Sequence, residues 1–80
     1  MRGVTQMIKE EQVCKSIRVA RHAAELTQDD AAKKVGVTRT TIGAWEGGDA
    51  LSMSLGSASK MADAYGTGSI DALISKYASA

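Results

Sequence analysis

Residues 27–48, TQDDAAKKVGVTRTTIGAWEGG, contain the start and stop signals of two short helices in close succession. Thr27 and Thr38 are each followed by a helical pattern, and a threonine hydroxyl at that place can accept a hydrogen bond from a free amide of the first turn. Gly36 stands between them, where glycine can adopt the left-handed conformation that ends a helix. The segment therefore predicts helices over about 28–35 and 39–46, joined by a tight turn.

Apolar and small side chains in this segment follow a helical period, which predicts one buried face on each helix. Ala31 and Ala32 are small enough for the two helices to cross closely. Short polar side chains and one arginine fall on the opposite side of the second helix, so that side is expected to be exposed. This is the layout of a helix-turn-helix. The expected inner set is Val35, Val37, Ile42 and Trp45; the outer set is Arg39, Thr40, Gly43 and Ala44, with Thr41 at the edge.

The rest of the chain is also predicted to be helical. A helix over about 7–25 has one apolar face, Ser54 is expected to cap a helix over about 55–65, and Ser69 is expected to cap a fifth helix. Leu55, Ala58, Met61, Ala62 and Tyr65 are expected on the inner face of the fourth helix. With 80 residues and no proline, the chain suits one all-α, five-helix bundle. We expect residues 1–12 to extend the first helix, 13–77 to form the domain, and 78–80 to fray.

The composition excludes several kinds of stabilisation and chemistry. A single cysteine, Cys14, cannot form an internal disulfide, and a single histidine, His22, does not provide a zinc site. No catalytic set, phosphate-binding glycine loop, signal peptide or membrane span is evident, so we expect a cytoplasmic protein that is not an enzyme. No metal, cofactor, small-molecule ligand or membrane partner is expected.

The net charge of +1 says little by itself, but the charges are unevenly distributed. Lysine and arginine gather between residues 15 and 45, and acidic residues dominate from Glu46 onward. This asymmetry is compatible with a site for a polyanion. The alternative is that these charges lie on ordinary solvated helix faces, and on charge alone that explanation is preferred.

Residues 17–74 resemble the lambda-repressor-like, Xre/Cro-type helix-turn-helix domain of prokaryotic and phage regulators. The resemblance runs through IRVAR, LTQDDAAKKVGVTRTTIGAWEGG, SLGSASKMADAYG and SIDALI. It implies a lambda-repressor-like bundle that binds double-stranded DNA, with a recognition helix at about 38–46 in the major groove. The chain departs from the usual pattern at Ala31, where leucine is common, at Gly47, where a basic residue is frequent, and in the loop over 49–54.

The resemblance also implies roles for individual residues. Arg39 is the best candidate to read guanine, because its fork matches the O6 and N7 atoms. Gly43 either permits close approach to a phosphate strand or is merely tolerated in the helix. The implied base contacts are Thr38, Arg39, Thr40 and Ala44; the implied phosphate contacts are Gln28, Thr41, Gly43 and Arg18; Arg21 and Glu46 match a structural salt bridge, and Ile42 and Trp45 match core anchors.

The function that these features favour is a sequence-specific transcriptional regulator, a repressor that acts as a homodimer on a palindromic operator. The alternative is an antitoxin, or another module whose main activity is to bind a partner protein. Residues of the last two helices are the candidates for the dimer interface: Tyr65, Ile70, Leu73, Ile74 and Tyr77.

Overall fold

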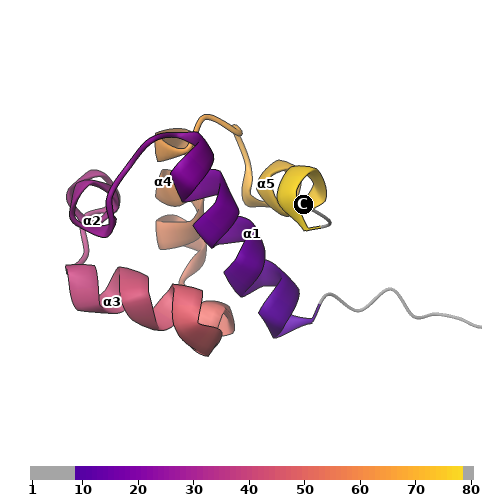
Figure 1. Cartoon of the computed structure of the whole chain (residues 1–80), viewed down its shortest axis with the longest axis horizontal. Helices are drawn as coiled ribbons and strands as arrows, with labels where there is room; N and C mark the ends of the chain where they lie inside the picture. Colours follow the sequence, from indigo (N-terminus) through magenta and orange to yellow (C-terminus); the bar gives the residue numbers. More distant parts are fainter. Residues whose placement is uncertain (1–8, 79–80) are drawn as a thin grey trace, which may run out of the picture.

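Residues 9–78 are described by a computed structural model in which the chain is built from α-helices joined by short connections (Figure 1). The predicted all-α, five-helix fold is confirmed. The second helix has the predicted bounds. In chain order the α-helices are α1 (Glu10–Ala23), α2 (Gln28–Val35), α3 (Arg39–Ala44), α4 (Leu55–Ala64) and α5 (Ile70–Tyr77).

Four helices begin directly after the residues that were predicted to cap them. The side-chain oxygen of each cap accepts a hydrogen bond from the backbone amide three residues later, at 3.0 Å for Thr27 and 3.1 Å for Thr38, Ser54 and Ser69. These bonds satisfy amides that have no partner inside the helix. At the other end of α2, Gly36 has φ 86°, the left-handed conformation that a glycine adopts without strain.

The first helix differs from its prediction at the C-terminal end. It stops at Ala23 rather than at residue 25, because Glu25 takes a left-handed conformation with φ 60°. The amide of Leu26 then donates back to the carbonyl of Arg21 over 3.1 Å, which closes the last turn. The helix also begins later than predicted, at Glu10 rather than at residue 7, because Lys9 has an extended backbone with ψ 143°. Residues 1–8 of the N-terminal extension and the last two residues of the tail lie outside the described residues.

The helix that contains α3 also continues further than predicted. After Ala44 the chain makes a single π-helical turn over Trp45–Asp49, labelled η1, and then a 3₁₀ turn over Ala50–Ser52, labelled η2. Gly48 lies inside η1 with φ 138°, a conformation that side chains rarely allow. Gly47 and Gly48 thus both lie in the π-helical turn, and the helical backbone is interrupted at Gly48.

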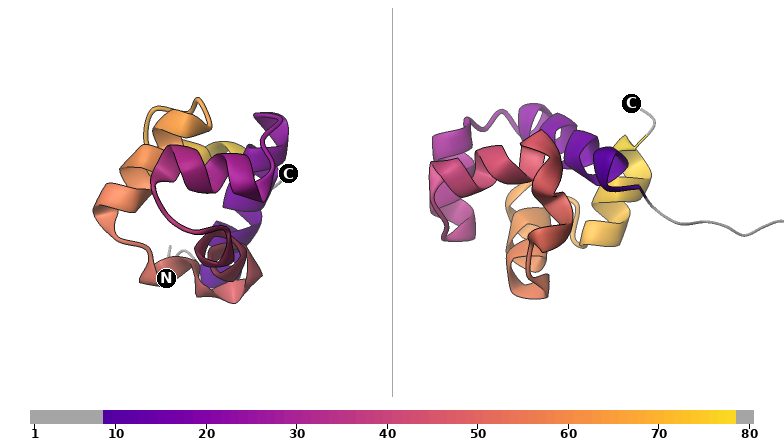
Figure 2. Two further views of the ribbon diagram at one scale, coloured as in Figure 1. Left: turned by 90° about the vertical axis from the view of Figure 1, so that its left-hand side faces the viewer. Right: turned by 90° about the horizontal axis from the view of Figure 1, so that it is seen from below.

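The core lies where α1 crosses the other helices. α1 packs against α5 and η1, while α2 packs against α3 and α4 (Figure 2). As a result, α2 and α3 form one end of the molecule and α5 lies toward the other end (Figure 1). Within residues 9–78, no helix is both long enough and apolar enough to span a membrane. The largest completely buried side chains are Ile17, Val35, Ile42, Met61 and Leu73.

One expected core residue is at the surface. Leu55 was predicted on the inner face of α4, but it is 87% exposed because it is the first residue of the helix and projects beyond the core. Leu51 in η2 is also 66% exposed. Ala58, Met61, Ala62 and Tyr65 do form the buried face of α4 and its end.

Candidate nucleic-acid interface

The two sides of α3 have opposite characters. Ile42 is completely buried, and Trp45, directly after the helix, is almost completely buried. Both side chains attach α3 to the body of the protein. The residues expected to contact bases lie on the other side, because Thr38, Arg39, Thr40 and Ala44 are all exposed. The expected phosphate contacts Thr41 and Gly43 are half-buried at the edges.

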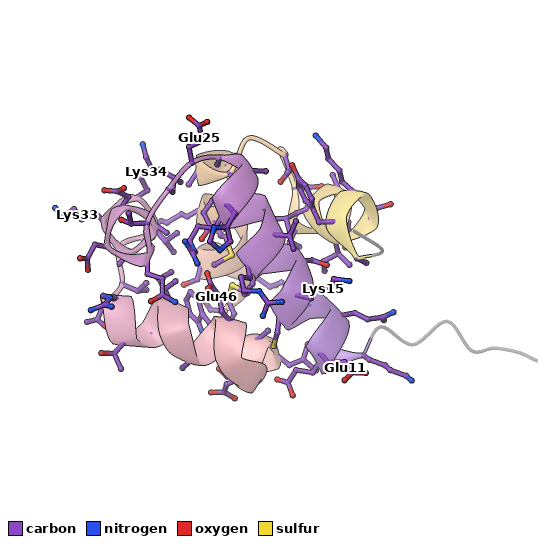
Figure 3. The ribbon with its side chains drawn as sticks, in the orientation of Figure 1. Glu11, Lys15, Glu25, Lys33, Lys34 and Glu46 are labelled. Atoms are coloured by element: carbon purple, nitrogen blue, oxygen red, sulfur yellow. The ribbon has the colours of Figure 1, made fainter. Side chains whose placement is uncertain are left out.

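A buried ion pair ties the C-terminal end of α3 to α1. The Arg21 Nε donates to Glu46 Oε2 over 2.6 Å, and the Arg21 Nη2 donates to Glu46 Oε1 over 3.0 Å. This is a bidentate pair, the arrangement in which a guanidinium and a carboxylate bind most strongly. Figure 3 shows Glu46 between the ribbons of α1 and α3.

Arg21 has a second partner outside the pair. Its Nη1 donates to the backbone carbonyl of Leu26 over 2.8 Å, in the connection between α1 and α2. The hydrogen bonds to the Glu46 carboxylate raise the pKa of Arg21, although burial alone would lower it. The guanidinium therefore stays charged inside the protein and connects three segments of the chain.

Gln28 begins α2 and is the expected phosphate contact on that helix. Its Nε2 donates to Glu46 Oε1 over 3.3 Å, so the amide group is joined to the same buried network. A β-carbon added at Gly43 would lie 3.9 Å from this Nε2 atom. The first residue of α2 and the middle of α3 are thus neighbours. Spacing along the chain gave no signal for the bond between Gln28 and Glu46.

Two further cations have different surroundings. Arg18 lies on α1 one turn before Arg21 and is exposed. Arg39 has an acidic neighbour, because its Nε lies 4.0 Å from Asp29 Oδ1 across the contact between α2 and α3. Asp29 was not among the expected site residues. It lies in the first turn of α2, where a negative charge also interacts favourably with the helix dipole.

Only part of the expected dimer surface is accessible. Tyr65 and Leu73 are buried in the core, where they fill space between α1, α4 and α5, so the structure corrects their assignment to an interface. Ile70, Ile74 and Tyr77 are half-buried. Two of these residues line an apolar groove of about 180 Å³, whose lining is Val13, Ala50, Leu51, Met53, Ala58, Ile70 and Ile74.

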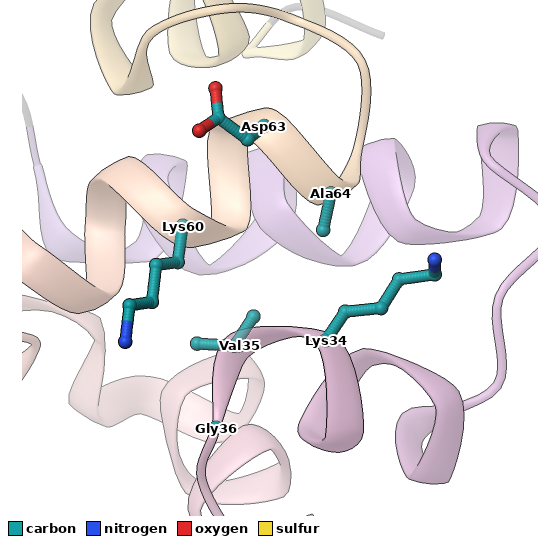
Figure 4. Close-up of a pocket in the computed structure, with 6 residues that line it drawn as sticks. All are labelled: Lys34, Val35, Gly36, Lys60, Asp63 and Ala64. Atoms are coloured by element: carbon teal, nitrogen blue, oxygen red, sulfur yellow. The ribbon is translucent and has the colours of Figure 1, made fainter.

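A second hollow lies between the end of α2 and α4. It has a volume of about 440 Å³, and the side chains of Lys34 and Lys60 flank its apolar floor of Val35 and Ala64 (Figure 4). Gly36 and Asp63 complete the lining. No residue pattern for nucleophilic or acid–base catalysis is present in this lining. In the described part of the chain, no three histidine, cysteine or acidic side chains are grouped to hold a metal ion.

Residues 16–74 match the family model described as helix-turn-helix domain. The matched region begins inside α1 and ends inside α5, so it includes parts of these two helices and all of α2, α3 and α4, with the exposed face of α3 and the ion pair beneath it. A comparison with curated proteins and a comparison with solved structures found no match.

Proposed function

The chain belongs to the helix-turn-helix domain family, and we propose that it is a transcriptional repressor that binds a palindromic DNA operator as a homodimer. Proteins with this motif place the second of its two helices, here α3, in the major groove of DNA. The observation that carries the proposal is the arrangement of α3. Its first residues are exposed, while Ile42, Trp45 and Glu46 hold its other side against the body.

The residues of α3 then have separate tasks. Arg39 donates two parallel hydrogen bonds to O6 and N7 of guanine, which is the geometry its guanidinium matches. The neighbouring hydroxyls of Thr38 and Thr40 contact bases or a thymine methyl group, and the methyl group of Ala44 contacts thymine. Phosphate contacts from Gln28, Thr41, Gly43 and Arg18 set the position of the domain on the duplex.

A homodimer follows from the small number of contacts that one domain can make. Two copies related by a twofold axis read two half-sites about 34–36 Å apart, one helical turn along the duplex. The exposed part of the apolar groove, with Leu51, Ile70 and Ile74, supports self-association, because contact with a second copy removes apolar surface from water. Repression then requires only that the bound dimer occupies a promoter.

The second candidate function is a module that binds a partner protein, such as an antitoxin. The exposed Leu51 and Leu55 favour it, because large apolar side chains at the surface are typical of protein-binding sites. An enzymatic function is not proposed, since neither hollow contains a catalytic set. The site of action proposed for either function is the cytoplasm.

The experiment that tests DNA binding is selection from a duplex library that is randomised over about two helical turns. Affinity for the selected duplex and for a scrambled duplex is then measured by fluorescence anisotropy at two salt concentrations. We expect a twofold-symmetric consensus, and binding that weakens with salt. If the protein enriches no sequence, sequence-specific DNA binding is wrong, and the partner-protein function becomes the leading one.

The substitution Arg39→Ala tests the recognition residue directly. We expect it to weaken binding to the selected duplex by about 1–3 kcal/mol and to remove the preference at one base pair in each half-site. Lys60→Ala on α4 is the control, because it removes the same charge from another helix. If Arg39→Ala instead weakens binding equally to all DNA sequences, Arg39 contacts a phosphate rather than a base.

A further inference from the structure

We propose that Asp29 is a positioning residue for Arg39, and that the pair makes the protein more selective for one base pair of its operator. This inference rests on the proposed function, because it concerns how the same site reads DNA. Asp29 lies in the first turn of α2, and Arg39 is the first residue of α3. The Oδ1 atom of Asp29 is 4.0 Å from the Nε atom of Arg39, and each side chain is about two-thirds exposed (68% for Arg39 and 67% for Asp29).

The two aspartates of this helical turn have different tasks. Asp30 completes the helix cap, because the amide of Thr27 donates to its carboxylate over 3.2 Å and its own amide donates to the Thr27 hydroxyl over 3.0 Å. Asp29 takes no part in these bonds. Within residues 9–78, Arg39 is the ion-pair partner that the structure records for it. The cap therefore accounts for Asp30, and Asp29 remains available to the side chain of Arg39.

The Asp29 carboxylate lies on the Nε side of the Arg39 guanidinium, and this side determines which N–H groups remain for a base. A guanidinium has five N–H groups in a fixed plane, and a guanine takes two of them. A carboxylate on the Nε side leaves the two terminal Nη groups free to point at the duplex. It also restricts a long side chain that is otherwise free to rotate, so less conformational entropy is lost when the base contact forms.

The same carboxylate weakens contacts that carry no sequence information. An unpaired arginine at this surface is attracted to any phosphate group, and such contacts support non-specific binding. Asp29 cancels much of that attraction and repels the backbone itself. Guanine presents two uncharged acceptors to the guanidinium, whereas a phosphate presents the negative charge that Asp29 repels. The pair thus lowers affinity for wrong sequences more than for the right one.

The test measures base preference with the substitution Asp29→Asn, which removes the charge and keeps the size of the side chain. The probes are the duplex selected by the wild-type protein and the same duplex changed at the base pair whose preference Arg39→Ala removes. We expect the ratio of the two affinities to fall by about two- to fivefold, the range that an exposed ion pair supports. Asp63→Asn on α4 is the matched control, because it removes the same charge from another exposed position.

A double-mutant cycle separates positioning from general electrostatics. In the Arg39→Ala background, Asp29→Asn should leave base preference unchanged, because there is no arginine to position. The inference is overturned if Asp29→Asn keeps the wild-type ratio, if Asp63→Asn lowers the ratio equally, or if Asp29→Asn still lowers it without Arg39. A wild-type protein that selects no sequence overturns the proposed function itself, which is a different result. Thermal unfolding of each variant verifies that the fold is retained.

Discussion

Glu46 holds α3 in place through one carboxylate. It is the second residue after α3, accepts two hydrogen bonds from Arg21, and accepts a third from Gln28. A buried charge is costly unless it is paired and hydrogen-bonded, so each member of this network depends on the others. Trp45 supplies the neighbouring apolar contact. The end of α3 opposite Arg39 is therefore held by one ionic and one apolar attachment.

Glu46→Ala should strongly destabilise the fold. The substitution leaves the Arg21 guanidinium buried without its carboxylate, and removing one partner of a buried pair costs about 3–5 kcal/mol. The measurement is urea unfolding at neutral pH, followed by circular dichroism. Replacing both partners, with Arg21→Met and Glu46→Leu together, should cost much less, because no unpaired charge remains. A loss under about 1 kcal/mol in Glu46→Ala would show that Arg21 reaches water when its partner is removed.

We expect the folded protein to lose stability at alkaline pH because of the buried side chain of Tyr65. Its hydroxyl is buried, and no group in the described part of the chain forms a hydrogen bond with it. Burial, together with the negative charge of Glu46, raises the pKa of Tyr65 to about 12. The folded protein then keeps this proton between pH 10 and 12 while the unfolded chain loses it, so the free energy of unfolding falls as pH rises.

Tyr65→Phe isolates this effect. At pH 9 the variant should be at least as stable as the wild-type protein, because it removes a buried hydroxyl that has no partner. At pH 11 the wild-type protein should lose about 1.4 kcal/mol more than the variant, which is the free energy of one unit of pKa shift. The measurement is urea unfolding at both pH values, with Tyr77→Phe as the control at a half-buried position. Equal losses in wild type and Tyr65→Phe would mean that Tyr65 ionises freely in the folded protein.

At the scale of helices, the sequence predicts a start that has a capping side chain better than it predicts an end. Thr27, Thr38, Ser54 and Ser69 each bond to an amide three residues later, so a short stretch of sequence contains the whole interaction. The end of α1 depends on a left-handed non-glycine residue, Glu25, for which the sequence has no local signal.

In the candidate site, too, the sequence predicts local features and misses those that depend on packing between helices. The exposed and buried sides of α3 follow from helical periodicity, so Arg39 and Ile42 could be assigned from the sequence alone. The bond from Gln28 to Glu46 and the approach of Asp29 to Arg39 could not, because each joins residues ten or more positions apart through the packing of α2 on the segment after it. The exposure of Leu55 was also missed, since periodicity does not show where a core ends.

Gly43→Ala should raise stability and weaken DNA binding. Gly43 lies inside α3, and an added β-carbon would meet only Gln28 Nε2 at an ordinary contact distance of 3.9 Å. Alanine at a helical position should therefore stabilise the fold by about 0.5–1 kcal/mol. The new methyl group would stand beside Gln28, in the surface proposed to approach a phosphate strand, so affinity for the selected duplex should fall.

Gly56→Ala is the matched control for this prediction. Gly56 is also helical, and its added β-carbon would lie 3.9 Å from the Ser54 Oγ, so a similar gain in stability is expected without any loss of DNA binding. The measurements are thermal unfolding and fluorescence anisotropy with the same duplex. Unchanged DNA affinity in Gly43→Ala would mean that this glycine is only tolerated in α3.

At the scale of the whole molecule, the proposed DNA-binding helix and the apolar groove occupy different elements. α3 and α2 form one end, whereas the groove is lined by residues of α1, η2, α4, α5 and the residue after η2. A second copy can therefore cover the groove while both recognition helices stay exposed. This separation of surfaces is what a twofold-symmetric dimer on DNA requires.

Leu51→Glu should weaken the proposed dimer without unfolding the protein. Leu51 lines the groove and is 66% exposed, so glutamate is tolerated in the monomer but would bury a charge at the interface. Burying one leucine contributes about 1.5–3 kcal/mol, so the dimer dissociation constant should rise at least about tenfold. Sedimentation equilibrium measures this constant, and anisotropy should show weaker binding to a palindromic duplex with unchanged binding to a single half-site.

The control is Ser59→Glu, because Ser59 is an exposed residue of α4 outside the groove. A Leu51→Glu protein that remains dimeric would locate self-association elsewhere, and a wild-type protein that is monomeric at all concentrations would leave the groove to a partner protein.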